Sequence, residues 1–579
     1  MQTTSQPKHA VRVDRNLAIT MRDGTRLFAD VYRPQDEGRY PVLMERTPYD
    51  KDASSETRLG AADFYASRGY ACVFQDVRGR FASEGEFYPF RDDGDGPNRD
   101  GYDTVEWAAE QPWSNGRIGT IGGSYSGATQ YRMLAARPPH LVAQYARQSA
   151  SDYHNEWVYR SGAFELGFNL MWTVKHNATN AHRLAHPDQV DARKGILDRA
   201  MAELDTWMEH MPLNPLPLVE DLSPWYSHWL DHPDDGPYWW QWNIAHRHHD
   251  VDTPVFHLGG WFDGFLRGTI ENYRGMRKLA RSERARTGQK MAIGPWVHGP
   301  DAVDSSSCGE VDFGPEAVLG VMQARLEWFD YWLKGIDTGV LESPNVRLFT
   351  MGANRWRDAD AWPPPGVTYT PYYFHEGTSG SARSLNDGVL NQSQPEPAEH
   401  PDSYVYDPRE PVRSLGGGHL GSPNGPHDQR PVEERVLTYT TAPLERDIEV
   451  TGPVKAVLHA LSSARDTDWV VRLTDVHPDG ISMQVCDGIL RARYRHSRSE
   501  PQPLDGRIEV YEVDLWATSH LFKKGHRLRV AVASSSFPRW DRNMNTGGDN
   551  NREATGVTAL NTIFHDSMRP SHILLPVMG

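Results

Sequence analysis

A strand pattern, a glycine-rich turn and a helix pattern follow one another directly in the first quarter of the chain. "RIGTI" (117–121) is typical of a short buried strand, and "SGATQYRMLAA" (126–136) predicts a helix. Gly122 and Gly123 between them permit a sharp turn. This succession would expose Ser124 at the carboxyl end of a strand, as a catalytic nucleophile requires. Glycine turns without a catalytic role have the same pattern, so these residues alone leave the role of Ser124 open.

The segments around this turn alternate between strand and helix patterns. Short apolar runs predict buried strands at "YPVLMERTPYD" (40–50) and "GYACVFQDVRG" (69–79). Helix patterns lie between and after them, at "AADFYASRG" (61–69) and "DTVEWAAEQPW" (103–113). Strands that alternate with helices predict a largely parallel sheet with helices on both faces.

After residue 150 helix patterns and tryptophan dominate. In "KGILDRAMAELDTWMEHM" (194–211) the apolar side chains recur at helical spacing, so one amphipathic helix is predicted there. Strand patterns then return in "TPVFHLGGW" (253–261) and "RTGQKMAIGPW" (286–296). A further helix pattern follows and ends at Gly335.

The patterns divide the chain into four segments. Residues 1–150 and 245–349 are predicted to be two halves of one α/β domain, and 151–244 a helical cap inserted between them. From 350 to 579, short strand patterns are separated by Pro, Gly, Asp and Ser turns, which favours a sandwich or jelly roll. The Pro-, Gly- and Ser-rich segment 376–434 within it is predicted to form long ordered loops.

Composition and charge limit the classes of partner. The 579 residues carry a formal net charge of −16, which disfavours nucleic acid and anionic membranes as partners. No apolar run is long enough for a transmembrane helix, and the first residues lack the apolar core of a secretory signal, so a cytoplasmic location is expected. Cys72, Cys308 and Cys486 are too widely separated to form a disulfide framework.

An acid and a base follow Ser124 in the chain order of the α/β-hydrolases. Asp263 comes just after the strand pattern 253–261, and His298 just after the pattern 286–296. Both therefore lie at the carboxyl ends of predicted strands, where open α/β sheets place their sites. Because the chain contains 25 histidines and 77 acidic residues, neither residue is specific by itself.

For two other clusters, a binding role competes with a purely structural role. "HRHHD" (246–250) contains metal-ligand residue types, but it has no companion cluster, and no metal site is predicted. "YWWQW" (238–242) is more typical of packing inside a cap than of a binding site.

Longer motifs extend over nearly the entire chain in a single order. They are "RTPYDK", "DVRGRFASEGEF", "DTVEWAAEQPWSNGRIG", "GGSYSG", "GWFDGF", "GPWVHG", "MGANRWR", "DTDWVVRLTDVHPDG" and "FPRWDRNMNTGG". With these motifs the chain resembles the family of bacterial cocaine esterase, whose relatives are X-Pro dipeptidyl-peptidases and α-amino-acid ester hydrolases. The nucleophile motif of that family is G-x-S-Y-x-G, which Gly122 to Gly127 match. The resemblance implies an α/β-hydrolase core with an inserted helical cap and a C-terminal all-β jelly-roll (galactose-binding-like) domain.

The resemblance also implies a role for each site residue. Ser124 is the nucleophile, His298 the general base and acid, and Asp263 the carboxylate that orients His298. The oxyanion hole consists of the backbone N–H of Tyr125 and the phenolic hydroxyl of Tyr49. This acyl transfer requires no metal and no organic cofactor, and none is expected.

Ester and amide substrates are difficult to distinguish within this family. In the α-amino-acid ester hydrolases that resemble it, acidic residues follow the catalytic aspartate shortly and hold the substrate ammonium. Here Asp263 is followed by Gly-Phe-Leu-Arg, which contains no acid, so a carboxylic ester without an α-amino group is favoured. Arg267 is interpreted as a helix-surface residue, and the alternative is a ligand of an acidic acyl group.

The acyl pocket is expected to be shaped by Trp157 and Trp172 of the cap and by Phe265. The C-terminal domain is expected to pack against the catalytic domain instead of binding carbohydrate. The predicted partner is a small-molecule ester or amide, and a homo-oligomer is compatible with the sequence. Two alternatives stay open: an amidase, acylase or X-Pro dipeptidyl-peptidase with the same triad, and a non-catalytic binding protein. The second requires a missing triad residue, and none is missing.

Overall fold

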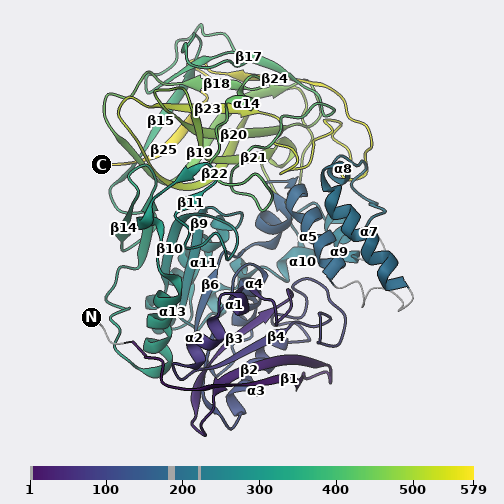
Figure 1. The fold of residues 1–579 in the computed structure, drawn as a ribbon. Coiled ribbons are helices and arrows are strands. Elements are labelled where there is room, and N and C mark those ends of the chain that lie inside the picture. The colour runs from purple at the N-terminus through teal and green to yellow at the C-terminus, as the bar shows by residue number, and fades with distance from the viewer. Residues whose placement is uncertain (1–3, 180–188, 220–222) are drawn as a thin grey trace.

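A ten-stranded sheet forms the centre of the first domain in this computed structural model, which describes residues 4–179, 189–219 and 223–579 (Figure 1). Its strands, in spatial order, are β1 (Val11–Thr20), β2 (Arg26–Pro34), β4 (Ala71–Asp76), β3 (Tyr40–Thr47), β5 (Ser114–Thr120), β6 (Leu141–Arg147), β9 (Val255–Phe262), β10 (Lys290–Val297), β13 (Val346–Thr350) and β14 (Arg355–Ala359). From β4 to β13 all neighbours are parallel, and antiparallel strands form both edges. The largely parallel sheet predicted from the sequence is therefore confirmed.

Helices cover both faces of this sheet because successive strand residues point to opposite sides. Val42 and Met44 of β3 pack in one apolar core, and Leu43 between them packs in another. The first core includes residues of α3 (Asp100–Glu110), α4 (Tyr125–Leu134), α11 (Leu266–Leu279) and α12 (Glu283–Thr287). The second includes residues of α2 (Ala61–Ala66), α13 (Val321–Phe329) and η6 (Asp330–Lys334).

Two of these helices end at or just before a helix-stopping residue of the sequence. α3 ends at Glu110, two residues before Pro112, which cannot continue a helix. Gly335 closes η6 in the left-handed conformation, with φ 71°, a region that glycine occupies without strain. The stop at Gly335 agrees with the prediction.

The segment 151–244 is largely helical and lies to one side of the sheet domain (Figure 1, right). Its elements are η1 (Tyr153–Val158), β7 (Tyr159–Arg160), β8 (Ala163–Phe164), α5 (Leu166–Thr179), α7 (Val190–Ala202), α8 (Leu204–Met208), α9 (Pro224–Asp231), α10 (Pro237–Trp240) and, at its end, η3 (Ile244–His246). The single helix predicted at 194–211 is wrong, because Glu203 (φ −108°, ψ 24°) interrupts it between α7 and α8. Trp239 and Trp242 are buried in the core of this segment, as the packing interpretation of "YWWQW" requires.

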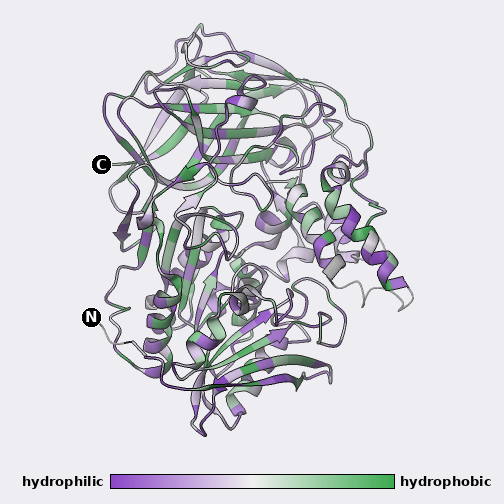
Figure 2. Cartoon of the chain, viewed as in Figure 1, coloured by the Kyte–Doolittle hydropathy of each residue, from purple (hydrophilic) through white to green (hydrophobic). Residues whose placement is uncertain are grey.

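The C-terminal domain is all-β, with eleven strands in one hydrogen-bonded array (Figure 1, top). These are β15 (Val367–His375), β16 (Gly388–Asn391), β17 (Asp402–Tyr406), β18 (Leu437–Thr440), β19 (Ile448–Ser462), β20 (Asp468–Val476), β21 (Ser482–Arg491), β22 (Glu509–Phe522), β23 (Arg527–Ala533), β24 (Ala559–Phe564) and β25 (His572–Met578). Figure 2 shows hydrophobic residues along the strands of this domain, and their inward side chains form its core.

Two features of the predicted organisation need correction. β14 lies beyond residue 349 and pairs with β13, so we propose that the first domain continues to the end of β14. The segment 376–434 is not loop throughout, because it contributes β16 and β17 to the second sheet and forms the short helix α14 (Arg430–Glu433). β17 takes its partner, β24, from a distant segment, whereas β14 pairs with the adjacent β13. In both places the local sequence does not specify which sheet the strand joins.

The C-terminal domain also forms hydrogen bonds with the first part of the cap segment. Asp541 Oδ1 accepts a hydrogen bond from the Phe164 N–H (2.8 Å), and Trp540 Nε1 donates to Glu165 Oε1 (3.0 Å). The Gly167 N–H donates to the carbonyl of Pro538 (2.8 Å). These contacts give a structural reason for the "FPRWDRN" motif. In the described part of the chain, no helix is both long enough and apolar enough to cross a bilayer.

Candidate active site

The carboxyl ends of four parallel strands carry the predicted site residues. Asp263 follows β9 directly, and His298 follows β10 directly. Tyr49 lies two residues after β3, and Ser124 lies in the turn between β5 and α4. Because parallel strands end at the same edge of a sheet, side chains far apart in the sequence are brought together there.

The turn at Ser124 has the geometry of a nucleophile elbow. Ser124 adopts φ 60° and ψ −125°, an unfavourable conformation for a residue other than glycine, and α4 begins at the next residue. Its N–H donates to the carbonyl of Arg147 (3.0 Å), which ties the turn to β6. A Cβ on Gly122 would lie 2.6 Å from Ser126 Cβ, so the turn has no space for a larger residue there. The close packing that Gly122 permits therefore positions the Ser124 hydroxyl.

The predicted acid and base are hydrogen-bonded to each other. His298 Nδ1 lies 2.7 Å from Asp263 Oδ1, and the Asp263 side chain is fully buried. The same carboxylate oxygen accepts a hydrogen bond from the Phe265 N–H (3.2 Å). With Nδ1 held by the carboxylate, Nε2 of His298 is the nitrogen left to exchange a proton.

Tyr49 and Tyr125 converge beside Ser124. The Tyr49 hydroxyl lies 3.4 Å from Ser124 Oγ, and Trp172 Nε1 donates to that hydroxyl (3.5 Å). Burial raises the pKa of Tyr49, although hydrogen bonds from Ser124, Trp172 and the Tyr125 backbone act in the opposite direction. The phenol therefore keeps its proton at neutral pH, and it can donate a hydrogen bond to a developing oxyanion.

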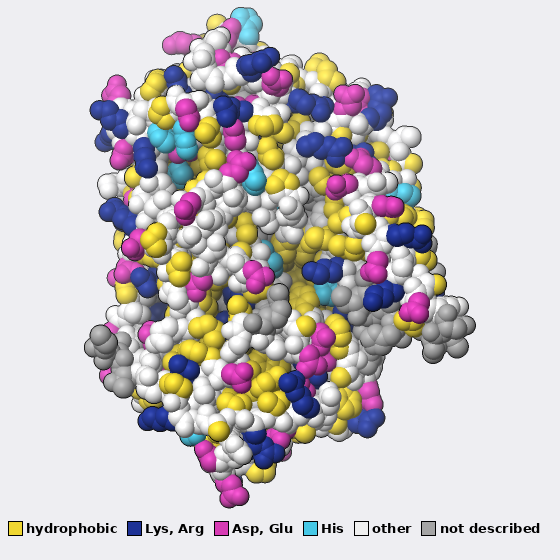
Figure 3. All heavy atoms as spheres, viewed as in Figure 1, with side chains coloured by type: hydrophobic (Ala, Val, Ile, Leu, Met, Phe, Trp, Pro, Cys, Tyr) yellow, Lys and Arg dark blue, Asp and Glu magenta, His cyan; other side chains and the backbone are white. Residues whose placement is uncertain are grey.

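These groups open onto a cavity of about 490 Å³ between the sheet domain and the cap. In Figure 3, hydrophobic side chains gather between the two domains beside the cap. The cavity is lined by Tyr49, Ala53, Phe81, Gly123, Ser124, Arg147, Gln148, Phe168, Met171, Trp172, Lys175, His176, His298, Gly299, Pro300 and Leu420. Leu420 belongs to the C-terminal domain, so that domain contributes to the lining as well as packing against the cap.

Of the three aromatic residues predicted to contact substrate, Trp172 lines this cavity. Trp157 and Phe265 do not belong to the lining: they are fully buried and stack on each other, with ring centroids 4.5 Å apart. Trp157 meets Trp172 edge to face (6.3 Å), and Phe265 meets His298 edge to face (5.2 Å). The two residues therefore form a second layer that supports lining residues.

Gln148 is a site residue that the sequence interpretation missed. Its Nε2 donates to the carbonyl of Val297 (2.7 Å), and its Oε1 accepts from the Gly299 N–H (3.0 Å). Gln148 thus holds the backbone on both sides of His298. Its signal was available, since Gln148 directly follows a strand, β6, as Asp263 and His298 follow theirs.

The charged side chains of the described lining are all cationic. Arg147 is buried next to Gly123, and its guanidinium lies 3.6 Å from Glu56. Lys175 is exposed on α5 at the edge of the cavity. Arg267 lies outside the lining, and its partly exposed side chain pairs with Glu271 (2.8 Å) and with Asp514 of the C-terminal domain (3.4 Å).

Comparisons with known proteins agree with this architecture. Residues 23–300 match the family model of the X-Pro dipeptidyl-peptidase (S15 family), and residues 338–574 match that of the X-Pro dipeptidyl-peptidase C-terminal non-catalytic domain. Cocaine esterase of Rhodococcus sp. (strain MB1 Bresler) is 37% identical over 97% of this chain and 98% of its own length. A putative serine esterase of Mycobacterium bovis is 28% identical over 92% of each chain.

Solved structures of similar fold include an α-amino acid ester hydrolase, with a TM-score of 0.80 and 26% identity over 100% of this chain and 98% of that chain. An aminopeptidase from a marine sediment Thaumarchaeota archaeon has a TM-score of 0.81 and 26% identity, with the same coverage. The protein is thus a serine ester hydrolase with an α/β-hydrolase core, a helical cap and an all-β C-terminal domain. Within that class, the chain belongs to the cocaine esterase family.

Proposed function

We propose that Ser124, His298 and Asp263 are the nucleophile, the general base and the orienting acid of this esterase. His298 takes the hydroxyl proton as Ser124 Oγ attacks the ester carbonyl, and then gives that proton to the leaving alcohol. Water activated by the same imidazole hydrolyses the acyl-enzyme. The proposal depends on one observation above all: the 2.7 Å hydrogen bond from His298 to the buried Asp263, with His298 and Ser124 on the same cavity.

The proposed oxyanion hole combines the phenolic hydroxyl of Tyr49 with the backbone N–H of Tyr125. The N–H lies at the first residue of α4, where the helix dipole adds positive potential. The phenol lies 3.4 Å from Ser124 Oγ, close to the place where the carbonyl oxygen of an acyl-enzyme would be. Because a phenol is a neutral donor, it stabilises the oxyanion without a second charge in the site.

The proposed substrate is a carboxylic ester with an apolar acyl group that carries no α-ammonium. Phe168, Met171 and Trp172 give the cavity an apolar wall. A substrate ammonium needs a carboxylate, and the described lining contains Arg147 and Lys175 but no Asp or Glu. This cationic lining therefore supports an ester without an α-ammonium group as the substrate. It argues against the aminopeptidase and α-amino-acid ester hydrolase activities named for similar structures.

The first test is covalent labelling of the full-length protein with a fluorophosphonate probe. Wild type should be labelled at Ser124 and lose its esterase activity, and Ser124→Ala should be neither labelled nor active. Ser126→Ala is the matched control, since Ser126 lies two residues away, at the second residue of α4, and is buried. Labelling that persists in Ser124→Ala, or full activity of that variant, would refute the assignment.

The second test separates ester from amide hydrolysis. One apolar acyl group is presented as an aryl ester and as an anilide, together with an α-amino ester and an X-Pro anilide. The ester should be hydrolysed with the highest kcat/KM, and addition of an α-amino group should reduce that value. If the X-Pro anilide or the α-amino ester is the better substrate, the dipeptidyl-peptidase or amidase alternative replaces the esterase proposal.

A further inference from the structure

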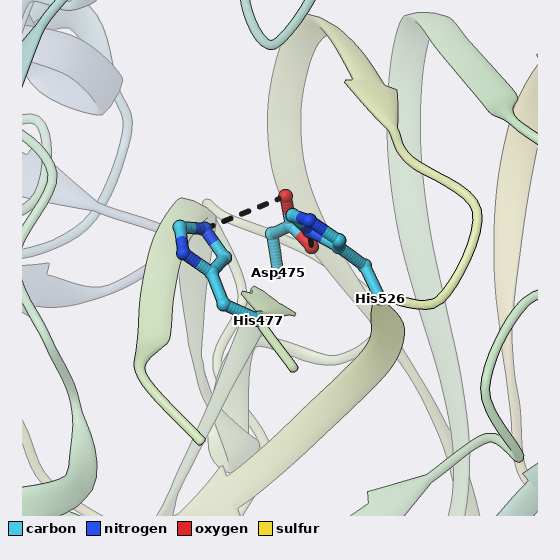
Figure 4. A group of neighbouring side chains, drawn as sticks. All are labelled: Asp475, His477 and His526. Atoms are coloured by element: carbon cyan, nitrogen blue, oxygen red, sulfur yellow. Dashed lines mark hydrogen bonds and ion pairs between the residues drawn. The ribbon is translucent and has the colours of Figure 1, made fainter. Parts of the chain in front are cut away.

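Three histidines surround one buried aspartate at a corner of the C-terminal domain. Asp475 lies near the end of β20, and His477 follows in the turn to β21. His526 directly precedes β23, and His520 lies near the end of β22. Figure 4 shows the rings of His477 and His526 on either side of the Asp475 carboxylate. None of these residues lines the active-site cavity.

The strand register brings the side chains together. In the antiparallel pair of β20 and β23, Val476 lies opposite Arg527, so His477 and His526 occupy the next opposing positions. Asp475 and His477 are two residues apart and therefore point to the same face. The turn is tight, because the Gly480 N–H donates to the carbonyl of His477 (2.9 Å). The backbone thus directs two imidazoles and one carboxylate to one place.

The distances suit a small divalent cation. His526 Nδ1 lies 2.9 Å from Asp475 Oδ1, and His477 Nε2 lies 3.9 Å from Asp475 Oδ2. One ligand atom from each of the three residues lies within 4.8 Å of the other two. Ligands about 2.0–2.1 Å from a tetrahedral zinc ion are roughly 3.3 Å apart, so small side-chain movements would complete the geometry.

The chemistry of the donors favours a transition metal. Neutral imidazoles with one carboxylate are ligands that zinc accepts. The His477 side chain is 35% exposed, which leaves a path for the ion and space for a water ligand.

His520 contacts the Asp475 carboxylate but is not one of the three grouped ligand residues. Its Nε2 lies 3.0 Å from Asp475 Oδ2, and a hydrogen bond there would fix the orientation of the carboxylate. The backbone of His520 pairs with Met351, just after β13 of the first sheet. The cluster therefore lies beside a junction between the two domains.

We propose that Asp475, His477 and His526 form a Zn²⁺ site with water as the fourth ligand, and that His520 positions Asp475. The ion would connect the β20–β21 turn to the β22–β23 turn and so stabilise the C-terminal domain next to its junction with the catalytic domain. This site is separate from the acyl-transfer chemistry, for which no metal is expected.

The test uses full-length protein treated with a chelator and then desalted. Titration with Zn²⁺, followed calorimetrically and by metal analysis after dialysis, should give one ion per chain in wild type. The double variant His477→Ala/His526→Ala should lose that ion. His400→Ala is the matched control, because His400 is an exposed histidine that also lies beside a carboxylate, Glu376 (3.2 Å), but outside the cluster.

Two further measurements separate binding at this cluster from adventitious binding. Zn²⁺ should raise the Tm of wild type and of His400→Ala but not that of the double variant. His520→Gln should retain the site with an affinity roughly 10–100-fold lower, since it perturbs only the orientation of Asp475. Absence of bound Zn²⁺ in wild type, or equal stoichiometry in the double variant, would overturn the proposal. Ester hydrolysis is measured in parallel and should be equal in all variants, so this result does not depend on the proposed function.

Discussion

The two walls of the active-site cavity are built differently. The catalytic wall consists of Tyr49, Ser124, Gln148 and His298, and the cap wall of Phe168, Met171, Trp172 and Lys175. Each residue of the catalytic wall follows a different parallel strand of the first sheet, whereas the cap wall comes from the single helix α5. The sheet thus positions groups that must meet within hydrogen-bond distance, and the helix presents a surface of one shape and polarity.

Hydrogen bonds distinguish the two walls further. On the catalytic wall, His298 is bonded to Asp263, and Gln148 holds the backbone on both sides of it. On the cap wall, Phe168 and Trp172 are held by packing against the buried Trp157. We therefore expect substitutions in the catalytic wall to reduce turnover for every substrate. Substitutions in the cap wall should change the choice among substrates.

Among substitutions that leave the triad intact, loss of the phenol should have the largest effect. Tyr49→Phe removes one of the two proposed oxyanion donors, and kcat should fall on the order of 10² to 10³-fold for all esters. The Tm should change little, because the ring still packs beside His176 (5.0 Å). Steady-state kinetics with three unrelated acyl groups check this prediction. Turnover close to that of wild type would exclude Tyr49 from the oxyanion hole.

The second-largest effect is expected from loss of the hydrogen bonds that hold the loop at His298. Gln148→Ala removes both hydrogen bonds to that loop, and misplacement of the base should lower kcat by about 10²-fold with KM nearly constant. Gln148→Glu retains an acceptor for the Gly299 N–H but loses the donor to Val297, so its kcat should be intermediate. If both variants change KM and leave kcat unaltered, Gln148 contacts the substrate and does not position His298.

The cap wall should respond to a change in the acyl group. Trp172→Ala should lower kcat/KM about 10-fold for large apolar acyl esters and less for acetyl esters, because the lost surface contacts only the larger group. Trp172→Phe keeps an apolar ring but removes the N–H that donates to Tyr49 (3.5 Å), and so separates packing from hydrogen bonding. A uniform decrease for all esters in both variants would place Trp172 functionally on the catalytic wall.

The smallest effect concerns charge at the edge of the cavity. Lys175→Glu should shift the preference between acyl esters with a carboxylate and esters with an ammonium by roughly two- to fivefold, because Lys175 is exposed and screened by solvent. The neutral variant Lys175→Gln should fall between the two, and added salt should reduce the difference. An unchanged preference would mean that Lys175 does not face bound substrate.

The positions of the proposed triad residues were predictable because each of the three carries a local signal. Ser124 lies in a strand–glycine–helix pattern, and Asp263 and His298 each follow an apolar strand. Such signals lie in neighbouring residues of the chain and can be recognised without knowledge of the tertiary structure. The break between α7 and α8 was missed because the apolar spacing continues across Glu203. β14 was missed because a strand pattern does not specify which sheet the strand joins.

The sequence alone determined the fold class, the chain order of Ser124, Asp263 and His298, which are the proposed nucleophile, acid and base, and the absence of a carboxylate directly after Asp263. Tertiary structure decided which aromatic residues line the cavity: Trp172 does, and Trp157 and Phe265 are buried behind it. It also brought Leu420 of the C-terminal domain to the site and gathered His477 and His526 around Asp475. The physical reason is the same in each case. Short-range periodicity in the sequence indicates where helices and strands form. The direction and burial of a side chain depend instead on elements that pack against it from elsewhere in the chain.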